Sequence, residues 1–215
     1  MKMIYSDQTK FFDPSKWTYP IHLIGAGGIN NLVGPTLAKM GITEIHIWDN
    51  DILEPRNCPT EVAYSYDLVG QPKAIAMQKT IERLMPSGSV KIFPHYERVT
   101  SDTDQLEGVV VSGVDSMESR QTIWEVVQRD LISIPLYIDG RSGGRFTQVF
   151  ALSPADFEAV EKYESWLFSD DKAMKLPCGA RNFPPVAAYF AMKIPAIIAS
   201  FQRDETVEFY TKYEV

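Results

Sequence analysis

An apolar segment that runs into a glycine-rich turn is the feature that most limits how this chain can fold. The apolar residues 21–24 precede the turn, and residues with helical spacing follow it. Without side chains, the turn lets a phosphate approach the backbone, and the next helix points its positive N-terminus there. A second apolar segment, 44–48, ends at Asp49 and Asp51, so this stretch predicts a nucleotide site. The turn contains three glycines: Gly25, Gly27 and Gly28.

Strands and helices alternate as far as residue 138, which is typical of a parallel sheet with helices on both faces. Short apolar runs predict strands at 22–24, 44–48, 90–93, 109–111 and 136–138. Apolar residues at helical spacing predict helices at 29–40, 73–85 and 116–129. We therefore expect a Rossmann-like, doubly wound α/β fold with a mostly parallel sheet.

The rest of the chain predicts additions to this sheet. Residues 139–144 resemble a turn into an antiparallel strand at 146–152, and residues 207–211 alternate as an edge strand does. The apolar stretch 185–202 predicts a helix that is kinked by Pro195 and too short to span a membrane. We expect one domain, residues 1–215, in four parts: an N-terminal arm at 1–19, a nucleotide-binding core at 20–152, a crossover region at 153–183, and a C-terminal helix and strand at 184–215.

Charge and composition exclude several classes of protein. The net charge of −7 implies no basic face for nucleic acid and suits a partner with a basic surface. No run approaches the roughly 18 apolar residues of a membrane span, and residues 1–12 are too polar for a signal peptide, so we expect a cytoplasmic protein without a membrane partner. Two cysteines in dissimilar contexts, Cys58 and Cys178, predict neither a disulfide scaffold nor a zinc site.

Further polar residues distinguish between two kinds of nucleotide. A glycine turn with an acid such as Asp49 some distance after it is found in dinucleotide sites generally, and it fits an NAD(P)-dependent oxidoreductase. Hydride transfer has no evident use for Asp51, Lys73 and Asp115, however. An enzyme that handles a triphosphate needs a lysine on the phosphates and a carboxylate on magnesium. The sequence thus favours ATP with Mg²⁺, and the oxidoreductase stays as an alternative.

Four motifs in a fixed order resemble those of the ThiF/MoeB/HesA family, which shares the catalytic fold of ubiquitin-activating enzymes. The motifs read GAGGIN, WDNDILEPRN, GQPKA and SGVDSMESR. The resemblance implies an ATP-dependent adenylyltransferase that adenylates the C-terminal carboxylate of a small ubiquitin-like or sulfur-carrier protein with a Gly-Gly-type end. It also implies a homodimer.

The resemblance assigns roles to individual residues by their position in the motifs. The glycines would line the nucleotide, Asp49 would hold the ribose, and Asp51 would face the α-phosphate. The phosphates would contact Asn57 and Lys73, with Arg56 in place of an arginine that the family has farther along the loop. Asp115 would bind magnesium.

Cys178 is the candidate for a second step, because relatives carry a cysteine in the crossover region that forms a thioester or a sulfur-bearing intermediate. Arg181 would lower the pKa of its thiol. The other interpretation of a lone cysteine is buried packing.

Several positions depart from the family pattern. Asn30 stands where a third glycine is common, and Thr60 and Glu61 replace an arginine and a glutamine that touch phosphate in relatives. No arginine precedes Arg56, so Lys10 or Lys16 would have to replace the arginine that reaches a partner subunit's ATP. These departures keep open a non-catalytic member that binds ATP or a partner protein. The remaining polar residues, among them Arg120, Arg141 and the histidines, have structural interpretations at least as good as functional ones.

Overall fold

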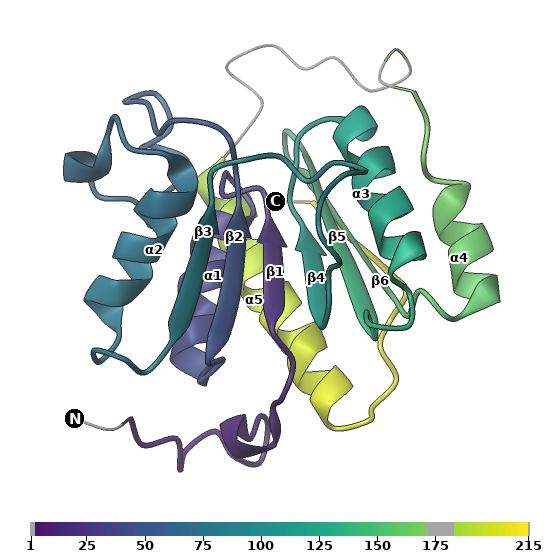
Figure 1. Ribbon diagram of the computed structural model, residues 1–215, viewed down its shortest axis with the longest axis horizontal. Helices are drawn as coiled ribbons and strands as arrows, with labels where there is room; N and C mark the ends of the chain where they lie inside the picture. Colours follow the sequence, from purple (N-terminus) through teal and green to yellow (C-terminus); the bar gives the residue numbers. More distant parts are fainter. Residues whose placement is uncertain (1–2, 170, 172–182, 215) are drawn as a thin grey trace.

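The computed structural model describes residues 3–169, 171 and 183–214, and its centre is one seven-stranded sheet with the order β3-β2-β1-β4-β5-β6-β7 (Figure 1). The first five strands in the chain pair in parallel, and β6 and β7 are added antiparallel at one edge. This confirms the predicted mostly parallel α/β fold with an antiparallel extension. The strands are β1 (Ile21–Ile24), β2 (Glu44–Trp48), β3 (Lys91–His95), β4 (Val109–Ser112), β5 (Leu136–Gly143), β6 (Phe146–Leu152) and β7 (Tyr210–Glu214).

Helices cover both faces of the sheet, because its central strands are apolar on both sides. In β4, Val109 and Val111 belong to one hydrophobic cluster and Val110 belongs to the other. The first cluster lies under α1, α2 and α5, and the second lies under α3 and α4. The helices are α1 (Asn30–Met40), α2 (Lys73–Leu84), α3 (Met117–Arg129), α4 (Phe157–Glu164) and α5 (Pro184–Gln202), with short 3₁₀ turns at Pro14–Lys16 and Tyr66–Leu68.

Two predicted boundaries near the antiparallel edge are wrong. Residues 139–143 continue β5 and pair with β6, where a turn was expected. The carboxylate of Asp139 can stay in this buried strand because two arginines neutralise it. The final strand is Tyr210–Glu214, three residues later than expected, since Val207 packs against the main hydrophobic cluster before the chain reaches β6.

The C-terminal helix α5 begins one residue before the predicted stretch, and the expectation that it is too short to span a membrane is wrong. With 19 residues it is long and apolar enough to cross a membrane by length and composition alone, a test that core helices of soluble proteins also pass. In this structure its apolar side, including Phe190 and Ile194, is buried in the main cluster. This side of the helix packs against the core of the domain.

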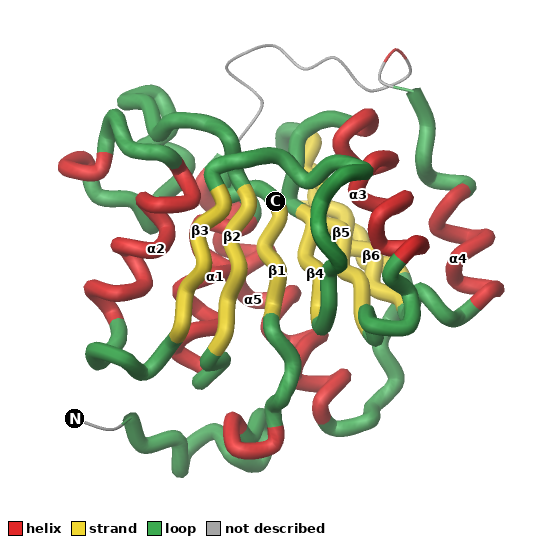
Figure 2. The backbone as a smooth tube through the Cα atoms, viewed as in Figure 1, coloured by secondary structure: helices red, strands yellow, loops and turns green. Residues whose placement is uncertain are grey.

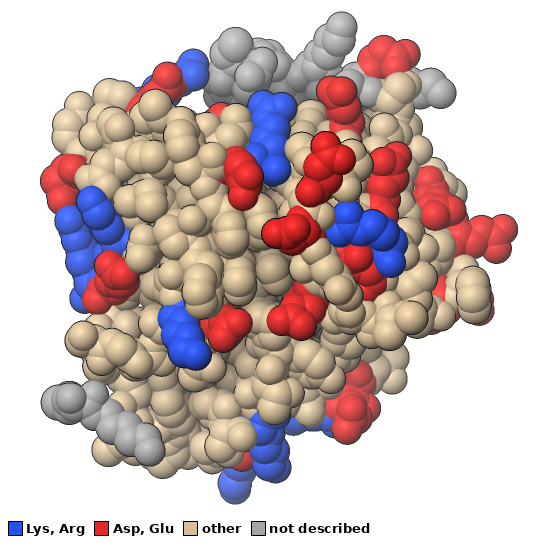
Figure 3. Space-filling view, in the orientation of Figure 1, with Lys and Arg blue, Asp and Glu red and all other residues tan. Residues whose placement is uncertain are grey.

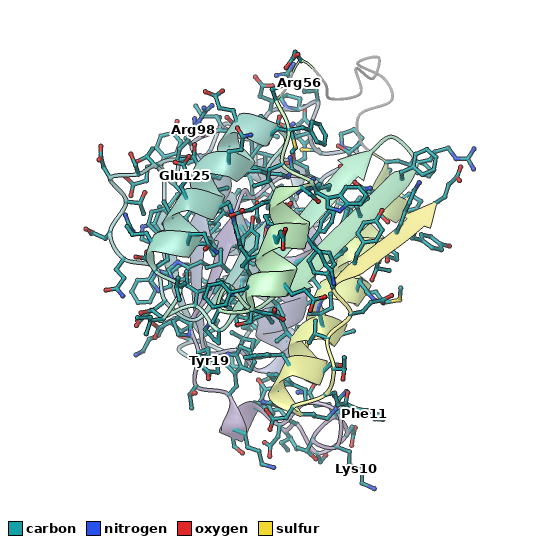
Figure 4. The ribbon with its side chains drawn as sticks, turned by 90° about the vertical axis from the view of Figure 1, so that its right-hand side faces the viewer. Lys10, Phe11, Tyr19, Arg56, Arg98 and Glu125 are labelled. Carbon is teal, nitrogen blue, oxygen red and sulfur yellow. The ribbon has the colours of Figure 1, made fainter. Side chains whose placement is uncertain are left out.

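The N-terminal arm packs beside the end of α5. The backbone N–H of Asp13 donates to Gln202 Oε1, and Gln202 Nε2 donates to the carbonyl of Asp13, both at 2.8 Å. Lys10, a candidate to reach a partner's nucleotide, lies at the opposite end of the molecule from Arg56 (Figure 4). Within one chain it does not approach the predicted site.

Candidate functional site

The predicted site forms where the carboxyl ends of β1, β2 and β4 meet. The Gly25 N–H donates to the carbonyl of Trp48 at 2.7 Å, and the Gly113 N–H donates to the carbonyl of Ile24 at 2.8 Å. Gly25 has a φ of +86°, and a Cβ there would lie 2.9 Å from the Gly113 carbonyl oxygen. Only glycine fits this position, because both the backbone angle and the space exclude a side chain.

Two asparagines hold the glycine turn together. Asn30 is the first residue of α1, and its side-chain amide donates to the carbonyl of Gly25 at 2.8 Å. Asn30 therefore supports the turn with its side chain. A Cβ on Gly113 would lie 2.8 Å from that amide nitrogen, so Asn30 requires the neighbouring glycine. Asn31 donates to the carbonyls of Gly27 and Gly28 at 3.0 Å each. Asn31 was not among the residues predicted for the site, although two adjacent amides at the start of an apolar helix were a signal.

Asp49 connects the turn to the loop after β2. Its Oδ2 accepts the backbone N–H of Ala26, and its Oδ1 accepts that of Asp51, both at 2.7 Å. Burial raises the pKa of this carboxyl group, against the effect of those two donors. Each oxygen retains a second lone pair, so these bonds leave room for a hydroxyl donor such as the predicted ribose.

Lys73 opens α2 and is buried, with only 7% of its surface exposed. Its Nζ lies 3.1 Å from Glu61 Oε1 and 3.7 Å from Asp51 Oδ2. Burial lowers the pKa of Lys73, but the surrounding carboxylates outweigh that effect and raise it, so the ammonium group stays charged. Glu61 is buried as well, and its Oε2 has no hydrogen-bond partner among the described residues. From the sequence, Glu61 was only a departure from a family motif and was not predicted to pair with Lys73.

A hollow of about 340 Å³ lies beside Lys73, which is within the size range of small-molecule sites. It brings together four of the predicted residues, Asp51, Arg56, Asn57 and Lys73, although the glycines, Asp49 and Asp115 do not line it. The exposed Arg56 is paired with Glu54. The long loop that supplies most of the lining folds over the carboxyl edge of the sheet (Figure 2). The lining residues are Asn50, Asp51, Ile52, Glu54, Arg56, Asn57, Lys73 and Tyr96.

The glycine turn adjoins this hollow and fits an anion. A Cβ on Gly27 would lie 3.9 Å from Lys73 Nζ, so the bare turn faces the buried ammonium group. The first turn of α1 follows directly and has no side-chain cap, so the helix N-terminus adds to the attraction of an anion. Backbone donors and a buried lysine are the chemistry that polyphosphate binding needs.

Asp115 is exposed on the loop after β4, directly before Ser116, which caps α3. No group of three or more His, Cys, Asp or Glu side chains in the described part of the chain forms a metal site. A single carboxylate still fits magnesium, which usually takes one or two carboxylates together with phosphate oxygens and water. Cys178 lies outside the described residues.

Two arginines that had open interpretations are structural. Arg120 Nε donates to Asp139 Oδ1 at 3.1 Å, and Arg141 Nε donates to Asp139 Oδ2 at 2.6 Å. The hydroxyl of Tyr163 donates to the same Oδ2 at 2.9 Å. Because all four groups are buried, this cluster is part of the second core. Arg141 is therefore a buried ion-pair partner, in agreement with its structural interpretation.

The three histidines are far apart in the sequence but lie side by side on one face of β1, β2 and β3. The rings of His22 and His46 stack with centroids 4.4 Å apart, and the ring of Trp48 stacks on His95 at 3.7 Å. Burial lowers the pKa of all three histidines, and that of His22 falls to about 3. They are therefore neutral near pH 7, and their structural interpretation agrees with this geometry.

Charges on the face seen in Figure 3 are mixed, with lysines and arginines separated by uncharged surface and by acidic groups. No continuous basic patch is visible on that face.

Comparison with known proteins gives consistent matches. The model of the ThiF family matches residues 18–215. The NEDD8-activating enzyme E1 catalytic subunit of Arabidopsis thaliana is 30% identical over 107 residues, which cover 48% of this chain and 23% of that protein. The sulfur carrier protein adenylyltransferase of Thermus thermophilus is 32% identical over 106 residues, covering 47% and 38%. The chain thus spans well under half the length of these curated relatives.

A solved structure shows the same fold. Escherichia coli MccB, crystallised with ATP, superposes with a TM-score of 0.73 at 21% identity, covering 94% of this chain and 62% of MccB. At this identity the likeness establishes the arrangement of strands and helices and leaves the chemistry to the site itself.

Proposed function

Because this chain belongs to the ThiF family, we propose that it adenylates the C-terminal carboxylate of a small ubiquitin-like or sulfur-carrier protein at the expense of ATP. The observation that carries the proposal is the buried Lys73, which faces the glycine turn beside a hollow lined by Asp51 and Asn57. Support comes from relatives named as a sulfur carrier protein adenylyltransferase and a NEDD8-activating enzyme subunit, and from a structural neighbour crystallised with ATP.

The described residues divide the work of binding and positioning. The glycine turn and the first turn of α1 hold phosphate oxygens with backbone N–H groups, and Lys73 offsets their charge. Asp49 takes the ribose, Asn57 and Arg56 contact phosphates, and Asp51 lies near the α-phosphate. Asp115 would hold Mg²⁺, which supplies further positive charge when bound.

Positioning accounts for most of the catalysis in this proposal. The incoming carboxylate is already ionised near pH 7, so no general base is required. Two anions must meet, and the cationic and N–H groups of the site have to offset their repulsion and align the attack. A buried ammonium group does this better than an exposed one, because water screens it less.

The finer parts of the proposal concern the partner and the assembly. The carrier protein has a Gly-Gly-type C-terminus and a basic surface, which suits the acidic chain. A homodimer would bring Lys10 or Lys16 of one arm to the other subunit's nucleotide. Cys178 would form a thioester or a sulfur-bearing intermediate after adenylation. We place the reaction in the cytoplasm, with no zinc, nucleic acid or membrane involved.

Pyrophosphate exchange tests the proposal. The protein is incubated with ATP, Mg²⁺, labelled pyrophosphate and candidate small proteins that end in Gly-Gly, and label in ATP reports reversible adenylation. Lys73→Ala and Asp115→Ala should each abolish exchange and leave the fold intact. The matched controls Lys79→Ala, on the exposed side of α2, and Asp102→Ala, on an exposed loop, should exchange like the wild type.

The same assay separates two rival functions. An ATP-binding module without turnover is suggested by the departures from the family pattern at Asn30, Thr60 and Glu61, and it predicts ATP binding with no exchange for any carrier. An NAD(P)-dependent oxidoreductase predicts binding of NAD(P) in place of ATP. Full activity in Lys73→Ala would remove that lysine from the site.

A further inference from the structure

A buried carboxylate occupies the place where a phosphate would meet Lys73. Glu61 Oε1 lies 3.1 Å from Lys73 Nζ, and a Cβ on Gly27 would lie 3.5 Å from the same oxygen. The carboxylate thus sits against the glycine turn and holds the lysine that the proposed nucleotide site needs. A triphosphate that binds here would compete with this carboxylate for the ammonium group of Lys73.

We propose that Glu61 takes up one proton when ATP binds, so that the triphosphate replaces it as the partner of Lys73. This inference rests on the proposed nucleotide site. It concerns this chain's own Glu61.

Among the charged and titratable groups that face Glu61, only Lys73 stabilises its ionised form. Lys73 reaches it from α2, Asp49 and Asp51 face it from the loop after β2, and the Tyr64 hydroxyl lies on its own loop. Lys73 is the one cation in this set of described residues. The second carboxylate oxygen of Glu61, Oε2, is buried with no hydrogen-bond partner in the described part of the chain. An ionised carboxylate therefore depends on Lys73 for its stability here.

Binding of a triphosphate would raise the pKa of Glu61. Burial already raises the pKa of Glu61, and Lys73 opposes the rise. A phosphate that draws Lys73 away removes the opposing effect and adds negative charge nearby, and both changes raise the pKa further. A group whose pKa rises on binding takes up a proton, and binding then tightens as the pH falls.

The protonated acid also has a use in the complex. A neutral Glu61 carries one O–H donor, which a phosphate oxygen can accept, whereas an ionised Glu61 only accepts. Protonation thus converts a group that repels the triphosphate into one that can hold it. A glutamine would make such a contact at every pH.

Calorimetry with a non-hydrolysable α,β-methylene analogue of ATP and Mg²⁺ tests the inference. Titrations in two buffers of different ionisation enthalpy give the protons taken up at about pH 7.5, and titrations between about pH 6 and 8 give the slope of log Kd. The wild type should take up close to one proton more than Glu61→Gln. As the pH rises, its Kd should increase more steeply than that of Glu61→Gln, by up to about tenfold per pH unit. Glu61→Gln should bind the analogue about tenfold or more tightly at the upper pH.

Glu82→Gln is the control, because it makes the same charge change on the exposed side of α2. It should match the wild type in affinity, proton uptake and slope. Equal proton uptake in the wild type and Glu61→Gln, or weaker binding by Glu61→Gln, would overturn the inference. If Glu61→Gln does not fold, as judged by thermal melting, absence of proton uptake in the wild type alone overturns it. Failure of both proteins to bind the analogue would instead refute the proposed nucleotide site.

Discussion

Acidification should destabilise this protein through His22, which the sheet holds in its neutral form. Trp48 Nε1 donates to His22 Nδ1 at 3.1 Å, which places the ring proton on Nε2. A second proton would have to go on Nδ1 and break that bond. Burial, and then the nearby His46 and His95, lower the pKa of His22 from 6.5 to about 3.

The size and sign of the effect follow from the two pKa values. Between pH 6.5 and about 3 the unfolded chain binds a proton at His22 that the folded protein does not. Stability therefore falls as the pH drops through this window, by about 1.4 kcal/mol per pH unit. At about pH 4.5 the loss is roughly 3 kcal/mol, a large share of the roughly 5–15 kcal/mol that stabilises a typical domain.

Urea unfolding of the wild type and of His22→Phe between about pH 7.5 and 4.5 measures this loss. The variant lacks the titrating group, and it leaves the indole N–H of Trp48 without its acceptor, which costs about 1–3 kcal/mol at every pH. The wild type should therefore be the more stable protein near pH 7.5. Its advantage should shrink by roughly 3 kcal/mol as the pH is lowered.

The test is how the difference in stability between the wild type and His22→Phe changes with pH, and not the stability of either protein alone. Carboxylates titrate in the same range, but they do so in both proteins and cancel in the comparison. A difference that stays constant from about pH 7.5 to 4.5 would show that His22 has the same pKa in the folded and unfolded protein, and would refute the reasoning.

Two further predictions concern packing at and beside the site. Gly113→Ala should destabilise the fold by about 1–3 kcal/mol, because its Cβ would lie 2.8 Å from Asn30 Nδ2. In thermal melts, Asn30→Gly should reduce that cost, and an equal cost in both backgrounds would contradict the contact. Asp139→Asn should cost about 3–5 kcal/mol in urea unfolding, because it leaves Arg120 and Arg141 as buried cations without their carboxylate. A cost below about 1 kcal/mol would mean that other groups satisfy the two arginines.

Much of the fold was predictable from local patterns. The strand Glu44–Trp48 and the helix start at Lys73 appear in the structure where the sequence predicted them. The family motifs also indicated a common edge for Asp51, Asn57 and Lys73, which line one hollow. Their individual roles toward ATP stay predictions.

The errors came from contacts between residues far apart in the chain. A turn was expected at 139–144, but Asp139 lies in a buried strand, where Arg120 from α3 neutralises its carboxylate. The histidines looked scattered because they lie on three different strands, and only the parallel register of β1 with β2 and β2 with β3 brings their rings together. Sequence spacing contains no information about such a register.

The glycine turn shows which features the sequence determines and which depend on the tertiary structure. The sequence alone determined that residues 25–28 form a bare turn between a buried strand and a helix, because glycine's freedom and the apolar spacing around it are local properties. Only the tertiary structure decided what faces the turn: Asn30 against Gly113 beneath it, and Glu61 paired with Lys73 beside it. Glu61 and Lys73 come from a loop and a helix that the fold packs together, and burial then makes their charges depend on each other.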